Sequence, residues 1–151
     1  GFETGRDDVL RSMRKGHTVD EAVEQARKLN EARLPFYTVI MYGIAGEGES
    51  LKNALSTAGM INRFKTGKVI TMNLVVFYGT ELDGMVKRGE FTPPGAKERL
   101  LEIRTLLESL TPEDRMVFDT THPTNIIKIF GTLPEDRQSL LAEVVRHLDK
   151  A

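Results

Sequence analysis

Hydrophobic residues recur at helical spacing in five stretches of the chain, each with one apolar stripe and charged residues on the opposite side. Thr18 and Glu21 have the spacing of a capping box at the start of the second stretch. Ser50 can cap the third stretch, and Thr92 with Pro93 can open the fourth. We therefore expect helices within residues 6–14, 18–34, 50–64, 92–110 and 134–148.

Two segments between these helices are apolar at nearly every position. They cover residues 36–42 and 69–77 and are rich in β-branched and aromatic side chains. Strands that are buried on both faces are typical of parallel sheets, and the alternation of helix and strand predicts an α/β fold with right-handed crossovers. Residues 116–118 form either a third, short strand or a docked extended segment.

Composition narrows the class of protein. The 151 residues include 21 Lys and Arg and 22 Asp and Glu. The chain therefore has no excess of positive charge that would support general nucleic-acid binding. No apolar run reaches the about 20 residues that span a bilayer, and we expect no signal peptide. The absence of Cys excludes disulfides and any iron–sulfur cluster ligated by these residues, and it fits a cytoplasmic location.

Three glycine-containing segments fall where the strands end. They are residues 3–5, 43–47 and 78–80. In parallel α/β folds ligands bind at the carboxyl ends of the strands, and glycine lets the backbone come close to a ligand. The alternative is that these glycines only form tight turns.

The ordered set of these segments resembles the radical S-adenosylmethionine (radical SAM) superfamily. GFETGRDDVL (1–10) followed by MRKGHT (13–18) is similar to the exit of the fourth barrel strand and the helix after it. YGIAGE (42–47) resembles the Gly-Leu-Pro-Gly-Glu loop after the fifth strand. YGTEL (78–82) resembles the Pro-Gly-Thr-Pro-Leu segment after the sixth strand. The similar branch contains methylthiotransferases, elongator-type proteins and oxygen-independent coproporphyrinogen oxidases. Ala45, Tyr78 and Glu81 depart from it, each standing where relatives have Pro.

This resemblance implies a fold and a division of the chain. Residues 1–91 would form the carboxyl-terminal half of a TIM-like (β/α) barrel with parallel strands, and residues 92–151 a helical extension packed on it. The missing amino-terminal half would be the partner of this chain and would hold the [4Fe–4S] cluster. The whole protein would cleave S-adenosylmethionine to a 5′-deoxyadenosyl radical that acts on an unknown substrate, and this chain alone would be inactive.

The resemblance also implies roles for individual residues in cofactor binding. Glu3 and Thr4 would lie beside the ribose or amino-acid end of S-adenosylmethionine, and Lys15 would pair with its methionyl carboxylate. The adenine would be approached by residues of the two later segments: Gly43, Ile44, Gly46, Tyr78 and Gly79.

Two of these roles have a structural alternative. Asn73, a polar residue on an apolar strand, would either face the barrel lumen and touch the ligand or serve as a hydrogen-bonded core amide. Lys15 would otherwise be a solvated charge at a helix end.

The competing interpretation of the whole chain is a non-enzymatic α/β binding or assembly module. A cluster motif Cys-x-x-x-Cys-x-x-Cys upstream of Gly1 would favour the enzyme. In either case two full strands cannot close a barrel, and their apolar residues on both faces predict self-association of the isolated chain.

Overall fold

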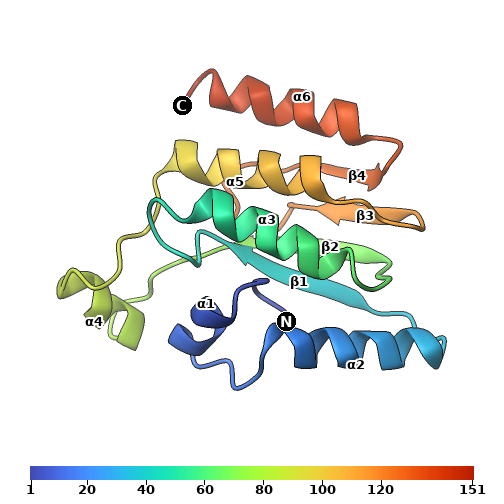
Figure 1. Cartoon of the computed structure of the whole chain (residues 1–151). Helices are drawn as coiled ribbons and strands as arrows, with labels where there is room; N and C mark the ends of the chain where they lie inside the picture. Colours follow the sequence, from blue (N-terminus) through green and yellow to red (C-terminus); the bar gives the residue numbers. More distant parts are fainter.

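The computed structural model describes residues 1–151 as a four-stranded sheet with helices on one face (Figure 1). The strands are β1 (Tyr37–Tyr42), β2 (Lys68–Asn73), β3 (Met116–Asp119) and β4 (Phe130–Leu133), in that spatial order. The first three are parallel, and β4 is antiparallel to β3. Glu3 adds an isolated parallel bridge to Ile40, on the free edge of β1. The α/β fold class is confirmed.

The chain has six helices: α1 (Asp7–Ser12), α2 (Val19–Glu31), α3 (Ser50–Ile61), α4 (Glu81–Lys87), α5 (Ala96–Ser109) and α6 (Arg137–Leu148). Of these, α3, α4 and α5 connect strands, α1 and α2 precede β1, and α6 follows β4. In Figure 1, α2, α3, α5 and α6 run side by side in one layer, whereas α4 stands apart at one end. The capping box predicted at Thr18 and Glu21 is present at the start of α2. None of the helices has the length and apolar character needed to cross a bilayer.

The hydrophobic core lies between the sheet and this helix layer. Because successive strand residues point to opposite faces, one residue in two is buried against the helices, among them Ile40, Val69 and Phe118. Ile103 and Leu107 of α5 pack against them and are fully buried. The alternate set, which includes Val39, Ile70 and Val117, is only partly buried, since no helix covers that face.

The strand predicted over residues 69–77 is shorter in the structure. β2 pairs with β1 only as far as Asn73, which lies opposite Tyr42, the last residue of β1. Leu74 still donates its N–H to the Tyr42 carbonyl, but beyond it no neighbouring strand offers partners. The segment then leads to α4, a helix that the hydrophobic pattern did not predict.

The fourth predicted helix begins later than expected, at Ala96 instead of Thr92. Thr92 and Pro93 each precede a proline, and this disfavours helical backbone at both positions. The Thr92 carbonyl instead accepts the N–H of Glu47 at 2.8 Å, which ties the segment to the loop after β1. The last helix likewise begins at Arg137, three residues after Pro134.

The carboxyl-terminal segment, expected to be helical, also extends the sheet. Residues 116–119 form a true parallel strand beside β2, so the strand alternative is correct for this segment. β4 then adds an antiparallel edge that the pattern did not predict. It has only four residues, one of them Gly131, which leaves too little alternation to recognise from sequence.

Candidate functional site

Two of the three predicted segments, residues 3–5 and 43–47, lie where the parallel strands end, as the α/β rule requires, whereas residues 78–80 lie beyond the end of β2 at Asn73. We call this region the carboxyl edge, defined by residues 3–5, 43–47 and 73–79. Glu3 joins it through its bridge to Ile40, and the other two segments follow β1 and β2 directly. The helices α3 and α5 begin close to it, so their first turns can supply side chains to the loops.

Glu3 and Lys15 meet at this edge. The Lys15 ammonium lies 3.0 Å from Glu3 Oε1, with the side chains 32% and 14% exposed respectively. Glu3 has a positive φ of 63°, which is uncommon for a residue with a side chain. The turn after α1 brings Lys15 back to the strand residue, and the pair offers a carboxylate and an ammonium side by side.

Thr4, also predicted to touch the cofactor, is turned to the helix layer instead. It is fully buried, and its hydroxyl donates to Asn53 Oδ1 of α3 at 2.5 Å. Thr4 Oγ1 also accepts the backbone N–H of Arg6 at 3.2 Å. The Thr4 hydroxyl hydrogen is therefore donated to α3 and is not available to a ligand.

The loop after β1, residues 43–47, is compact and largely covered. Gly43 and Gly46 have φ values of +78° and +89°, and both are buried together with Ile44. A side chain at Gly46 would lie 3.3 Å from the ring of Phe91, so glycine is needed for close packing as well as for backbone conformation. The backbone groups of Ile44 and Ala45 take no part in hydrogen bonds within the chain.

A buried carboxylate that the sequence analysis missed supports this loop. Glu102 of α5 is 2% exposed; its Oε2 accepts the N–H of Gly43 at 2.8 Å, and its Oε1 accepts Asn53 Nδ2 at 2.7 Å. Burial raises the pKa of Glu102 despite these two hydrogen bonds, which favour the ionised form. The sequence feature that could have indicated this role is the position of Glu102 directly beside Ile103, a residue of the apolar stripe of the helix.

Arg99, one turn earlier on α5, holds the exit of β2. Its guanidinium donates to the carbonyls of Pro94 at 2.7 Å and Leu74 at 3.1 Å, and to Asn73 Oδ1. Burial lowers the pKa of Arg99, although the neighbouring acidic groups oppose the shift. Asn73 also donates to the Thr124 carbonyl at 3.1 Å, and this favours the hydrogen-bonded amide over the ligand contact.

Tyr78 and Gly79 lie in the connection to α4, away from the covered loop. Tyr78 is 91% exposed, and the Lys87 ammonium lies 4.7 Å from the centre of its ring. The N–H of Gly79 donates to Asp83 Oδ2 at 3.0 Å, which fixes the turn before the helix. The Tyr78 ring thus remains available for stacking on a partner.

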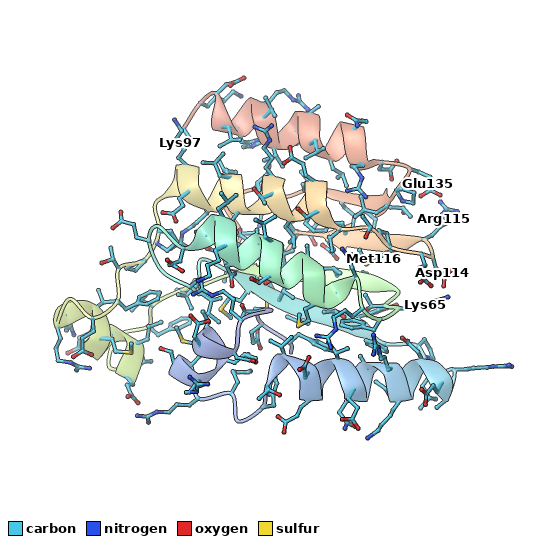
Figure 2. All side chains as sticks on the ribbon, viewed as in Figure 1. Lys65, Lys97, Asp114, Arg115, Met116 and Glu135 are labelled. Atoms are coloured by element: carbon cyan, nitrogen blue, oxygen red, sulfur yellow. The ribbon has the colours of Figure 1, made fainter.

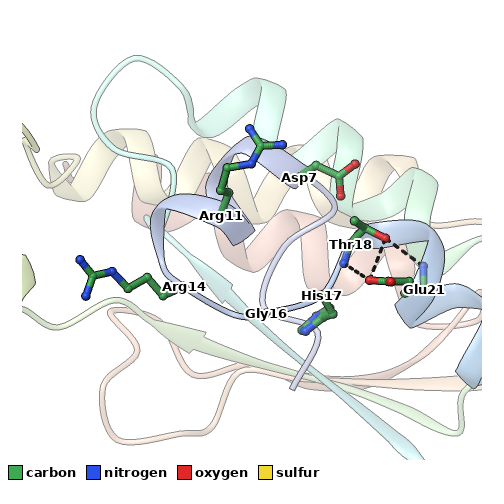
Figure 3. Close-up of a pocket in the computed structure, with 7 residues that line it drawn as sticks. All are labelled: Asp7, Arg11, Arg14, Gly16, His17, Thr18 and Glu21. Carbon is green, nitrogen blue, oxygen red and sulfur yellow. Dashed lines mark hydrogen bonds between the residues drawn. The ribbon is translucent and has the colours of Figure 1, made fainter.

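The largest cavity, about 430 Å³, lies between α1 and α2 and is lined only by polar and glycine residues (Figure 3). Its two arginines, Arg11 and Arg14, point in different directions in Figure 3, and Arg14 pairs with Glu81 of α4. Thr18 and Glu21 are occupied by the capping box. The side chains do not converge on one ligand, so this cavity is not the candidate site.

Exposed ion pairs occupy the opposite end of the sheet. Lys65 lies 3.3 Å from Glu113 and 3.1 Å from Asp114, and Arg115 lies 2.9 Å from Glu135 (Figure 2). These pairs are solvated surface charges that contribute little to stability. We therefore place the candidate site at the carboxyl edge and not among these exposed ion pairs.

Known proteins are similar to this chain in sequence and in fold. No family model matches it. It is 28% identical over 114 residues to the tRNA uridine(34) acetyltransferase of Methanocaldococcus jannaschii, and 25% identical over 114 residues to that of Methanocaldococcus infernus. Each match covers 75% of this chain and 21% of the relative, so the chain spans about a fifth of the length of these proteins.

A solved structure shares the fold. The archaeal Methanocaldococcus infernus Elp3, solved with an N-terminal deletion, superposes with a TM-score of 0.68 at 22% sequence identity. The superposition covers 99% of this chain and 35% of that one. Together the matches support the resemblance to the radical SAM superfamily, whereas the assignment to one half of the barrel stays a prediction.

Proposed function

We propose that this chain is the carboxyl-terminal half of a radical SAM barrel and supplies part of the S-adenosylmethionine pocket of a larger enzyme. The observation that carries the proposal is the Glu3–Lys15 pair at the carboxyl edge. The amino-acid end of S-adenosylmethionine is a zwitterion with an ammonium and a carboxylate on one carbon. Glu3 would accept from the ammonium and Lys15 would donate to the carboxylate, so the pair matches both charges.

The loop after β1 fits the other end of the cofactor through its backbone. The N–H and C=O groups of Ala45, which is only partly buried, are free of partners within the chain and can read an adenine edge. Ile44 is as buried as its glycine neighbours and would not present its backbone to the ligand. Gly43 and Gly46 would act indirectly, by giving the loop its conformation, because both are buried. Tyr78 would contribute an exposed ring for stacking.

The iron–sulfur cluster does not fit this chain, which contains no Cys. Its ligands would lie in the amino-terminal half of the barrel, the partner already expected. With both halves present, the cofactor supplies 5′-deoxyadenosyl radical chemistry. The residues of this chain would bind and orient it through the charges and backbone groups described above.

The two curated relatives are tRNA uridine(34) acetyltransferases, and we propose a tRNA uridine as the substrate of the whole protein. The net charge of −1 gives this chain no excess of positive charge for the RNA phosphates. RNA affinity would therefore come from other parts of the protein.

The binding role of the ion pair is tested in the whole protein by calorimetry with S-adenosylmethionine. Glu3→Ala and Lys15→Ala should each weaken binding by about 1–3 kcal/mol, because each removes a charge-assisted hydrogen bond to the ligand. Lys28→Ala serves as a control, since Lys28 forms a comparable but exposed ion pair on α2. Unchanged affinity in both variants would show that the Glu3–Lys15 pair has a structural role and does not bind the cofactor.

The isolated chain separates the enzyme fragment from a non-enzymatic module. After anaerobic reconstitution and reduction it should carry no iron and form no 5′-deoxyadenosine, because it has no thiolate ligand. The whole protein should do both. A whole protein without iron or cofactor cleavage would favour the binding or assembly module.

A further inference from the structure

We infer that Glu102 and Asn53 are positioning residues that set the loop after β1 relative to the exit at Glu3 and Thr4, so that both reach one ligand. The inference rests on the proposed function, because the ligand concerned is the cofactor of that site. Neither residue touches the ligand in this arrangement. Both act through the backbone of the loop and through Thr4.

The geometry is a continuous chain of three hydrogen bonds across four segments of the fold. Thr4 Oγ1 donates to Asn53 Oδ1 at 2.5 Å, Asn53 Nδ2 donates to Glu102 Oε1 at 2.7 Å, and the N–H of Gly43 donates to Glu102 Oε2 at 2.8 Å. The links join residues 49 to 59 positions apart in the sequence. They connect the first strand exit, α3, α5 and the loop after β1.

Burial makes this arrangement specific. All three side chains are almost inaccessible to water, so an unpaired polar atom among them would be costly. Each donor meets one acceptor, and the carboxylate uses its two oxygens for two different donors. A network with matched donors and acceptors favours one relative position of its elements over neighbouring ones.

The position of Gly43 connects the network to ligand binding. Gly43 immediately precedes Ile44 and Ala45, whose backbone groups are free, and its positive φ sets the direction in which the chain leaves β1. A carboxylate that fixes the Gly43 N–H therefore fixes where the free groups lie. Arg99 acts in parallel at the neighbouring exit by binding Leu74 and Asn73.

Exchanging the polarity of the pair tests the inference. In Asn53→Asp two carboxylates face each other, and the affinity of the whole protein for S-adenosylmethionine should fall about tenfold. In Glu102→Gln the amide nitrogen of the new side chain faces the amide nitrogen of Asn53, so two donors meet. If Asn53 flips, its nitrogen faces Thr4 instead, and the Thr4 hydroxyl hydrogen loses its acceptor. The affinity for S-adenosylmethionine should therefore fall about threefold. The double variant restores every donor–acceptor match and should bind within about twofold of wild type.

Two controls separate positioning from stability. Glu108→Gln is the same substitution at an exposed position of the same helix and should leave affinity unchanged. Hydrogen exchange of the Gly43 amide reports on the loop without any cofactor: protection should fall in each single variant and return in the double variant. Where a single variant does not fold, the double variant must regain both folding and affinity.

The outcomes distinguish this inference from the proposed function. Wild-type protein that binds the cofactor while Asn53→Asp binds equally well would overturn the positioning role alone. A folded double variant that remains tenfold weaker would also overturn it. Wild-type protein that does not bind S-adenosylmethionine would overturn the proposed function, and the inference would fall with it.

Discussion

At the scale of single residues, Asp119 and Lys68 place an ion pair on the sheet, with 3.4 Å between the carboxylate and the ammonium. Burial by itself would raise the pKa of Asp119, but hydrogen bonds from Thr121 and the charge of Lys68 outweigh it and hold the pKa below its usual value. A carboxyl group with a lowered folded-state pKa stabilises the fold only while it is ionised. This contribution is complete above the unfolded pKa and disappears as pH falls through the folded one.

Asp119→Asn should therefore lower the free energy of unfolding by about 1 kcal/mol at neutral pH. The difference from wild type should shrink as pH falls below the ordinary pKa of 3.8. Urea unfolding at a series of pH values measures it. A difference that stays constant down to acid pH would contradict the assigned role of the charge.

Residue identity alone could not give the hydrogen-bond partners of two predicted site residues. Asn73 is a polar residue on an apolar strand, and the sequence offers no means to tell a lumen-facing side chain from a hydrogen-bonded amide. Its partners Arg99 and Thr124 are 26 and 51 positions away, so only the folded chain reveals them. Thr4 is similar, because its acceptor lies on α3.

At the scale of elements, the first strand exit packs directly on α3. A Cβ atom at Gly5 would lie 2.2 Å from the carbonyl oxygen of Ser56, and the Gly5 N–H donates to Thr57 Oγ1 at 3.0 Å. The strand residue and the helix therefore approach each other as closely as their backbones allow. Only glycine permits this contact.

Gly5→Ala should destabilise the protein by about 2 kcal/mol or more, because α3 must move away from the strand exit. The matched control is Gly59→Ala, inside α3, where a Cβ would meet nothing within 4 Å. That change should stabilise the protein by about 0.5–1 kcal/mol through helix propensity. Thermal unfolding of both variants measures the contrast. Equal effects of the two substitutions would contradict the close approach.

At the scale of the whole molecule, the helices form one layer and leave the second face of the sheet without cover (Figure 1). That face carries the partly buried Val39, Ile70 and Val117, with the exposed rings of Tyr37 and Phe130 at its borders. Glu3 provides only an isolated bridge at the free edge of β1. Apolar surface and open strand edges of this kind favour association.

We therefore predict that the isolated chain self-associates, which light scattering over a range of concentrations will measure. Ile70→Glu should shift the equilibrium to the monomer, because it places a charge in the centre of the bare face. Leu51→Glu, on the outer side of α3, is the matched control and should leave association unchanged. A wild-type chain that stays monomeric at every concentration would show that this face tolerates water.

Features that depend on near neighbours in the chain could be predicted from the amino-acid pattern. The capping box of α2 needs only residues 18 and 21, and β1 is recognisable because its apolar residues are consecutive. The alternation of helix and strand from α1 to β2, and the glycine-containing segments at residues 3–5 and 43–47, follow from the same local patterns. Local hydrogen bonds and side-chain periodicity act over about four residues, within the range that a sequence pattern shows.

The lengths of strands and the hydrogen-bond partners that depend on distant contacts became known only from the folded chain. β2 ends where β1 can no longer pair with it, and β4 exists because β3 offers it an edge. Glu102 has no local reason to be buried, and its role depends on donors that fold against it from 49 and 59 positions away. Burial turns such long-range matches into strong constraints, because a buried polar group must find its partner wherever the fold brings one.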